Sequence, residues 1–286
     1  MSSGYKLPLL LLILVIAALA AMDLRMMRAQ SAPTAAGVLR VCADPNNLPF
    51  SNDRGEGFEN RLAELLARDL HKQVAYTWWP QRRGFIRNTL DAGRCDIVIG
   101  VPASYEPVHT TAPYYRSSYV FVTRRADRLH IDTFDDERLR TLRIGLHTIG
   151  DDYSNVPPAE ALARRGITRN VRGYPIYGDY SQPSPARALI DAVARDEIDV
   201  AIAWGPIAGY FAGKVAVPLD VNVLSAQVEE PRLAMRYSIA MGVRRDDSEL
   251  SAQLGRAIDR RRADIRELLA SYGVPLVDAA FAKDSP

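Results

Sequence analysis

The 286-residue sequence has few of the side chains that catalysis and metal binding need. It contains two cysteines and four histidines, and the histidines (His71, His109, His130, His147) are scattered without the spacing of metal ligands. It also lacks a Ser/His/Asp order, a Gly-x-Ser-x-Gly elbow, a phosphate-binding glycine loop and a pair of glutamates. The sequence therefore predicts neither an enzyme nor a metal-binding protein.

A strong charge of one sign is also missing. The net charge is +2, and the first 32 residues carry Lys6, Arg25 and Arg28 against Asp23, which accounts for all of it. The remaining chain is neutral and therefore offers no general field for a nucleic acid. Its 48% of hydrophobic residues is typical of a packed globular protein.

The one long apolar run is too short to be an ordinary membrane span. Residues 7–22 are uncharged and follow Lys6, whereas a spanning helix needs roughly 18 to 20 residues. This pattern fits a secretory signal peptide, with cleavage near Ala20, Ala32 or Ala36. The alternative is an uncleaved N-terminal anchor. In either case we expect the rest of the chain to lie outside the cytoplasm. We interpret residues 1–32 as signal peptide and linker, which leaves no stable membrane span after processing.

Both cysteines, Cys42 and Cys95, lie beyond this segment. In an oxidising compartment two buried thiols that lie close together form a disulfide, so we expect one here. Cys42 and Cys95 approach opposite ends of neighbouring parallel strands. The bridge therefore requires the loop that precedes the strand at residues 95–101. Two free thiols remain the alternative.

Strands and helices alternate in the first part of the chain. Apolar runs predict strands at residues 38–44, 73–79 and 95–101, and helical spacing predicts helices at 58–70 and 84–93. Such alternation indicates an α/β fold with a parallel sheet, here in the flavodoxin-like strand order 2-1-3.

The same order of elements recurs at residues 141–205, which predicts a second α/β lobe. Two further strand-like segments, 117–125 and 235–245, link the lobes and form a hinge, and an amphipathic helix after Asp247 returns to the first lobe. The expected boundaries are residues 37–122 plus 236–286 for lobe 1 and residues 123–235 for lobe 2.

Ligands of open α/β sheets bind beyond the carboxyl ends of the strands. Five loops occupy such positions, and their side chains are aromatic or polar, which suits a cleft for an apolar or hydrogen-bonding ligand, or for a partner's side chains. Trp78 and Trp79 are adjacent, so one of them faces the core. The asparagines of the first loop also suit ordinary turns, and Asp151 suits a helix cap. The candidates are Asp44, Asn46, Asn47, Phe50, Ser51, Asn52, Trp79, Ser104, Tyr105, Thr148, Asp151, Tyr153 and Trp204.

The stretches "CADPNNLPFSN", "GFEN", "GRCDIVIGV" and "IDVAIAWGPIAGY" together resemble the extracellular solute-binding proteins of the polar-amino-acid type. More narrowly, the sequence is similar to the MxaJ/XoxJ branch, which is associated with quinoprotein methanol and alcohol dehydrogenases. The resemblance implies a periplasmic two-lobe binding-protein fold of type II. It also implies that pyrroloquinoline quinone and a metal belong to the partner dehydrogenase and not to this chain.

Two departures from the amino-acid-binding pattern bear on the ligand. Those proteins carry an Arg after the third strand that clamps the substrate carboxylate, whereas this sequence has Pro107, Val108 and His109 there. The acidic residue that meets the substrate's amino group is replaced by Trp204. An amino acid would therefore lack both charged partners.

Three functions are compatible with these features. The first is a non-enzymatic accessory protein that binds a quinoprotein dehydrogenase and assists its activation or maturation. The second is a transport receptor for a small neutral or aromatic molecule. The third, an enzyme such as a dehydratase on the same fold, has no acid/base pair to support it.

Overall fold

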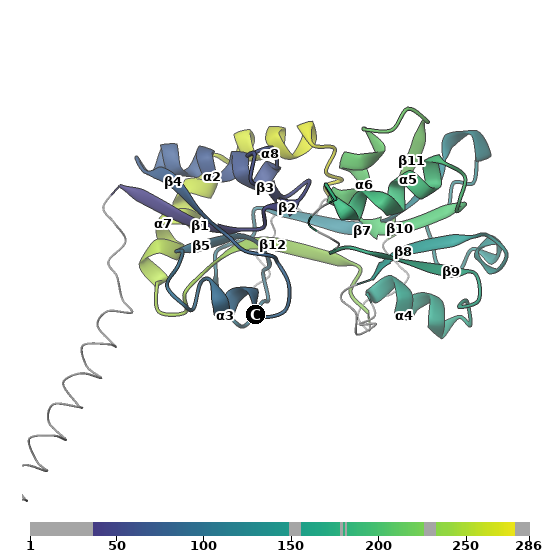
Figure 1. The fold of residues 1–286 in the computed structure, drawn as a ribbon, viewed down its shortest axis with the longest axis horizontal. Helices are drawn as coiled ribbons and strands as arrows, with labels where there is room; N and C mark the ends of the chain where they lie inside the picture. Colours follow the sequence, from purple (N-terminus) through teal and green to yellow (C-terminus); the bar gives the residue numbers. More distant parts are fainter. Residues whose placement is uncertain (1–36, 149–155, 178–179, 181, 226–232, 278–286) are drawn as a thin grey trace, which may run out of the picture.

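The structure, a computed structural model, describes residues 37–148, 156–177, 180, 182–225 and 233–277. The molecule is elongated, with two lobes side by side along its long axis (Figure 1). Within these residues no helix combines the length and the apolar character needed to cross a membrane.

A mixed sheet runs through both lobes in the order β4-β1-β5-β12-β7-β10-β8-β9, with β6 paired to β12 and β11 paired to β7. A separate two-residue hairpin, β2–β3, lies in the first loop. The strands are β1 Val38–Ala43, β2 Asn46–Asn47, β3 Ser51–Asn52, β4 Gln73–Trp78, β5 Ile97–Pro102, β6 His109–Thr110, β7 Tyr115–Arg124, β8 Ile144–Thr148, β9 Val171–Pro175, β10 Val200–Trp204, β11 Leu219–Val223 and β12 Arg236–Val243.

The parallel part of lobe 1 has the expected order, because β1 lies between β4 and β5. The long strands β7 and β12 then run antiparallel to each other from lobe to lobe. Beyond their shared stretch, β12 pairs with β5 in lobe 1 and β7 pairs with β10 in lobe 2. The predicted type II two-lobe α/β fold is confirmed. The exact lobe boundaries stay a prediction, since β7 passes from one lobe to the other without a break.

In lobe 1, the helices α2 (Phe58–Asp69), α7 (Ser248–Arg260) and α8 (Arg262–Ser271) pack on one face of the sheet (Figure 1). Alternate strand residues face them, because side chains of a strand point to opposite faces in turn. The fully buried residues of this layer include Leu39, Val41, Phe58, Leu62, Leu66, Ile97, Ile99, Met241 and Leu254.

Lobe 2 covers its sheet on both faces. Val200 and Ile202 of β10 face the layer of α4 (Pro157–Arg164), while Ala201 and Ala203 face that of α5 (Ala188–Ala194) and α6 (Gly205–Ala212). A strand buried on both sides explains the uninterrupted apolar run of β10.

Two predicted helices differ from the structure. In place of a helix at 84–93, the chain forms only α3 (Phe85–Asn88), because Thr89 leaves the helical conformation and its hydroxyl donates to the Phe85 carbonyl (2.7 Å). The C-terminal helix is divided at Arg261, whose backbone is not helical and whose side chain donates to Asp69 of α2 (2.8 Å). The strands β2, β3, β6 and β11 had no expected counterpart.

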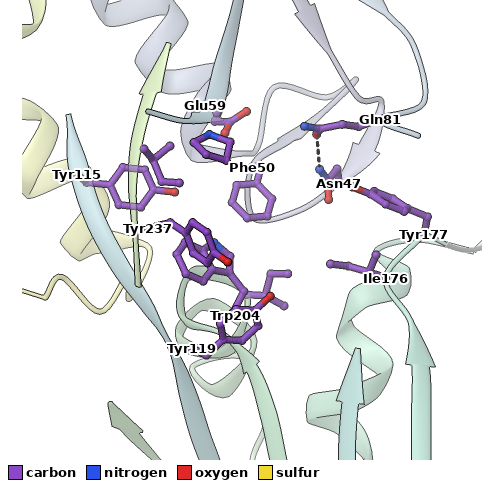
Figure 2. A pocket seen from close by; sticks show the side chains of 14 residues that line it. Asn47, Phe50, Glu59, Gln81, Tyr115, Tyr119, Ile176, Tyr177, Trp204 and Tyr237 are labelled. Carbon is purple, nitrogen blue, oxygen red and sulfur yellow. Dashed lines mark hydrogen bonds between the residues drawn. The ribbon is translucent and has the colours of Figure 1, made fainter. Parts of the chain in front are cut away.

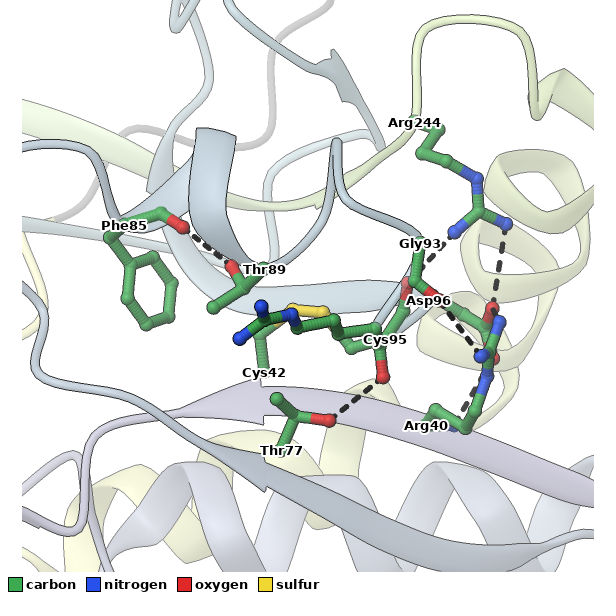
Figure 3. Close-up of a disulfide and its surroundings, with 10 residues drawn as sticks. Arg40, Cys42, Thr77, Phe85, Thr89, Gly93, Cys95, Asp96 and Arg244 are labelled. Carbon is green, nitrogen blue, oxygen red and sulfur yellow. Dashed lines mark hydrogen bonds and ion pairs between the residues drawn. A yellow bond between two sulfur atoms is a disulfide. The ribbon is translucent and has the colours of Figure 1, made fainter. Parts of the chain in front are cut away.

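A disulfide joins Cys42 of β1 to Cys95, which lies two residues before β5 (Figure 3). The Cα atoms are 5.5 Å apart, within the range that a disulfide spans. Hydrogen bonds fix the loop around Cys95, since Arg244 donates to the Cys95 carbonyl (2.7 Å) and Arg40 pairs with the fully buried Asp96 (2.6 Å). The bridge therefore involves the preceding loop, as strand geometry requires.

A C-terminal strap, residues 272–277, extends from α8 along β7 to α6 of the other lobe. Ser117 of β7 donates to the Pro275 carbonyl (2.7 Å), and the Tyr272 ring stacks on Tyr210 of α6 at 5.7 Å. Two glycines of the "WGPIAGY" stretch allow this approach: a Cβ on Gly205 would meet the Pro275 ring, and one on Gly209 would overlap the Gly273 carbonyl. The strap ties the lobes together.

Removing the disulfide by the pair Cys42→Ala and Cys95→Ala lowers stability. The crosslink joins residues 53 apart, and the chain-entropy model assigns such a loop about 4 kcal/mol. Urea unfolding of the parent and the double variant measures the difference. The parent in reductant is the control, and equal free energies of unfolding in all three samples would contradict the expectation.

Gly209→Ala tests the strap. The new methyl group forces the strap off α6, and we expect a loss of roughly 1–3 kcal/mol, as is usual for overpacking. Gly255→Ala is the matched control, because nothing lies within 4 Å of the methyl group there, and an alanine inside α7 stabilises the helix by about 0.5–1 kcal/mol. Chemical unfolding compares the two. Equal effects would show that the strap contributes nothing.

Candidate functional site

A cavity of about 320 Å³ lies between the lobes (Figure 2). Both lobes and both crossing strands line it, so it occupies the place where a two-lobe binding protein holds a ligand. Aromatic side chains make up much of the wall. The lining residues are Asn47, Phe50, Glu59, Gln81, Gly100, Pro102, Tyr115, Tyr119, Ile176, Tyr177, Trp204, Ile207, Tyr237 and Ile239.

Asp44, at the end of β1, organises the first loop and is 1% exposed. Its carboxylate accepts hydrogen bonds from the backbone N–H groups of Asn46 (2.8 Å) and Gln81 (2.6 Å) and from the hydroxyl of Tyr180 (2.6 Å). Burial and this last bond raise the pKa of Tyr180. Because Tyr180 belongs to the second lobe, Asp44 both shapes the loop and joins the lobes.

Asn46 makes a second bridge between the lobes. Its side-chain NH₂ donates to the Gln182 carbonyl (2.8 Å), and its side-chain oxygen accepts from the backbone of Ser184 (2.9 Å). Leu48 adds an apolar contact, because it is buried in the core of lobe 2. The first loop thus crosses the cleft and holds the lobes closed through residues of the chain itself.

The "GFEN" stretch, residues 57–60, forms the start of α2, and each of its residues has a different structural role. Gly57 lies against the Phe50 backbone, where a Cβ would overlap, and Phe58 enters the core. The Asn60 side chain accepts from the backbone N–H groups of Gly57 and Asn52 (both 3.1 Å), which caps the helix. Glu59 is left facing the cavity.

Ser51 and Asn52 support the loop and do not line the cavity. The Ser51 hydroxyl donates to the Asp44 carbonyl (2.8 Å), and Asn52 exchanges hydrogen bonds with Glu56 through its side chain (2.7 and 2.8 Å). Both are at least 95% buried. They fix the backbone from which Asn47 and Phe50 project.

Other sequence candidates lie elsewhere. Trp79 packs beside the disulfide, with the Arg94 guanidinium 5.2 Å from its ring centre. Ser104 and Tyr105 are exposed on the turn after β5, and Thr148 packs against Gly173. Asp151 and Tyr153 lie outside the described residues. Of the thirteen candidates, the cavity brings together Asn47, Phe50 and Trp204.

A row of aromatic rings along the crossing strands is absent from the candidates that the sequence suggested. Tyr119 of β7 meets Trp204 edge to face at 5.6 Å, and Trp204 meets Tyr237 of β12 in the same way at 5.8 Å. Tyr115 precedes Tyr119 by four residues, which places both on one face of the strand. That spacing is the signal from which the two tyrosines could have been found.

Glu59 was also missed, and among the described residues it is the only ionisable acid or base that lines the cavity apart from the tyrosine hydroxyls. Its carboxyl lies directly over Gly100 of β5, where any Cβ would collide with it. Burial raises the pKa of Glu59 to about 8. No Arg, Lys or His is among the residues described as lining the cavity. Elsewhere in the described chain, no three His, Cys, Asp or Glu side chains group to hold a metal ion.

A family model described as bacterial extracellular solute-binding proteins, family 3, matches residues 39–274. The chain belongs to this family. Protein MoxJ from Methylorubrum extorquens is 30% identical to this family 3 protein over 264 residues, covering 87% of this chain and 85% of that protein.

Solved structures agree with the family. Periplasmic binding protein XoxJ from Methylobacterium extorquens AM1 is 34% identical with a TM-score of 0.70, covering 84% of this chain and 100% of that one. MxaJ from Methlophaga aminisulfidivorans MPT shares the fold at 24% identity and a TM-score of 0.73, with the same coverage. The predicted membership of the MxaJ/XoxJ type is confirmed.

Glu59→Gln tests the electrostatics of the cavity. The pKa of this carboxyl is about 8 in the folded chain and about 4.3 in an unfolded one, so between these values the folded chain holds the extra proton. Its stability therefore falls as pH rises through this window, by at most about 1.4 kcal/mol per pH unit. We expect the variant to lose this slope and to be more stable than the parent at pH 8.

Urea unfolding between pH 5 and pH 8 measures the slope across that window. Glu64→Gln on the same helix is the control, because the Glu64 side chain is 41% exposed. A slope that Glu59→Gln leaves unchanged would refute the raised pKa.

Proposed function

We propose that this family 3 protein is a non-enzymatic periplasmic accessory protein of a pyrroloquinoline-quinone-dependent methanol or alcohol dehydrogenase. It binds the dehydrogenase and assists its activation or maturation. The similarity to MoxJ and XoxJ over most of the chain supports this proposal, together with the association of the MxaJ/XoxJ branch with these dehydrogenases.

The observation that carries the proposal is the charge of the cavity. An amino-acid receptor needs a cation for the substrate carboxylate. Among the described residues, the lining has no cation for such a carboxylate and instead presents the Glu59 carboxyl. The scaffold is thus that of a receptor, while the cavity is unsuited to the nutrient that such receptors carry.

Closure by the chain itself supports the same conclusion. The first loop and the strap join the lobes through direct hydrogen bonds and stacked rings. A transport receptor uses its ligand to draw the lobes together. Here residues of the chain itself make contacts between the lobes, which suits a protein that presents a fixed surface to a partner.

Pyrroloquinoline quinone does not suit this cavity. It carries three carboxylates, which need cationic partners. The described lining provides Glu59 and neutral side chains in their place. We therefore assign the quinone and its metal to the partner dehydrogenase.

Titration of the purified chain against the matching dehydrogenase, before and after cofactor loading, tests the proposal. Biolayer interferometry should show saturable binding in at least one state, and the loading rate or activity of the dehydrogenase should rise. An amino-acid-binding member of family 3 is the control. Absence of binding in both states would refute the proposal.

A second candidate is a transport receptor for a small neutral or aromatic molecule, and the aromatic wall of the cavity favours it. In that case a ligand should raise the melting temperature while the dehydrogenase has no effect. The same protein preparation can be titrated with the dehydrogenase and with small molecules. Binding of the dehydrogenase indicates the first function, and a rise in melting temperature with a small molecule alone indicates the second.

A further inference from the structure

Glu59 has no hydrogen-bond or ion-pair partner among the described side chains, although it faces the cavity. Its backbone N–H donates to the Phe50 carbonyl (2.9 Å), so both side chains project from one corner of the wall. Gly100 leaves the space that the carboxyl occupies. The described part of the fold thus makes room for a carboxyl group without providing it with a hydrogen-bond or ion-pair partner.

The rings around this carboxyl carry negative charge on their faces. Phe50, Tyr115, Tyr119, Trp204 and Tyr237 surround the cavity (Figure 2). Aromatic faces attract a cation within about 6 Å of the ring centre, and tryptophan does so best. A carboxylate and an aromatic wall favour the same sign of ligand charge.

We propose that this cavity binds a small organic ammonium ion, with Glu59 as its counter-ion and the aromatic residues as its walls. The inference does not depend on association with a dehydrogenase. A volume of about 320 Å³ is at the lower end of the range for small-molecule pockets, which suits an ion of the size of choline or benzylammonium.

An inorganic cation suits the site less well. Calcium takes six to eight oxygen ligands and magnesium six, whereas the described lining offers one carboxylate and the amide oxygens of Asn47 and Gln81. The Gln81 oxygen already accepts from Asn47 (3.0 Å). Rings cannot replace the water shell of a hard metal ion, but they match the methyl and methylene groups of an alkylammonium.

Proton linkage gives the site a pH dependence. Glu59 must ionise to pair with the cation, and its pKa of about 8 in the free chain means that affinity should rise by up to about 50-fold from pH 6 to pH 8. The titratable groups that face it are Tyr76 of β4, Tyr114 just before β7, and Tyr115 of β7. Burial raises the pKa of all three, so they stay neutral over this range.

Isothermal titration calorimetry with choline tests the site, because choline stays charged at every pH. The control ligand is 3,3-dimethylbutan-1-ol, which has the same shape without the charge. We expect choline to bind at least about tenfold more tightly than the alcohol. Glu59→Gln should reduce this preference and abolish its pH dependence, and Glu64→Gln should leave both unchanged.

Benzylammonium and tetramethylammonium extend the test to ions of other sizes. Binding of any of the three that falls in Glu59→Gln supports the proposal. Equal affinity for choline and the alcohol, equal affinity of Glu59→Gln and the parent for the cations, or no heat from any cation at millimolar concentration would overturn it. None of these outcomes bears on dehydrogenase binding, which is measured separately.

Discussion

The buried carboxylate of Asp44 is the interaction on which the closed arrangement of this protein depends. Within lobe 1 it holds the loop after β1 through the backbone of Asn46 and joins it to the segment after β4 through Gln81. Across the cleft it accepts from Tyr180. An ionised acceptor strengthens each of these bonds, and removal of the carboxylate would leave several donors without their partner. One residue therefore sets both the shape of the cavity wall and the contact between lobes.

The strap supplies a second contact between lobes, on a different element. It depends on close approach of backbones at Gly205 and Gly209, whereas the Asp44 contact depends on charge and hydrogen bonds. In chain order, "WGPIAGY" begins with Trp204, which lines the cavity, and ends with Tyr210, which stacks on the strap. The α6 helix thus connects the wall of the cavity to the closure of the lobes.

The fold could be predicted from the sequence, because long apolar strands that alternate with amphipathic helices are compatible with few topologies. The sequence also placed Asn47, Phe50 and Trp204, since strand ends are where α/β sheets bind ligands. The sequence did not identify Glu59 as a cavity residue. An acidic residue in the first turn of a helix normally faces solvent and interacts favourably with the helix dipole. Only the glycine of a distant strand, Gly100, makes room for that carboxyl in the interior. The prediction that Trp79 lines the cleft failed for a similar reason. Its ring packs against Arg94 and the disulfide cluster, and these are tertiary contacts that a local sequence pattern does not reveal.

Contacts that the chain itself makes between its lobes change what binding can accomplish in this scaffold. In a receptor that opens and closes, part of the free energy of binding is spent on closing the lobes, and the closed form reports that a ligand is present. Here Asn46, Leu48 and the strap already stabilise the closed form. The more these contacts populate the closed form, the less a ligand in the cavity shifts the two populations. The outer surface presented to a partner would then change little when the cavity is filled.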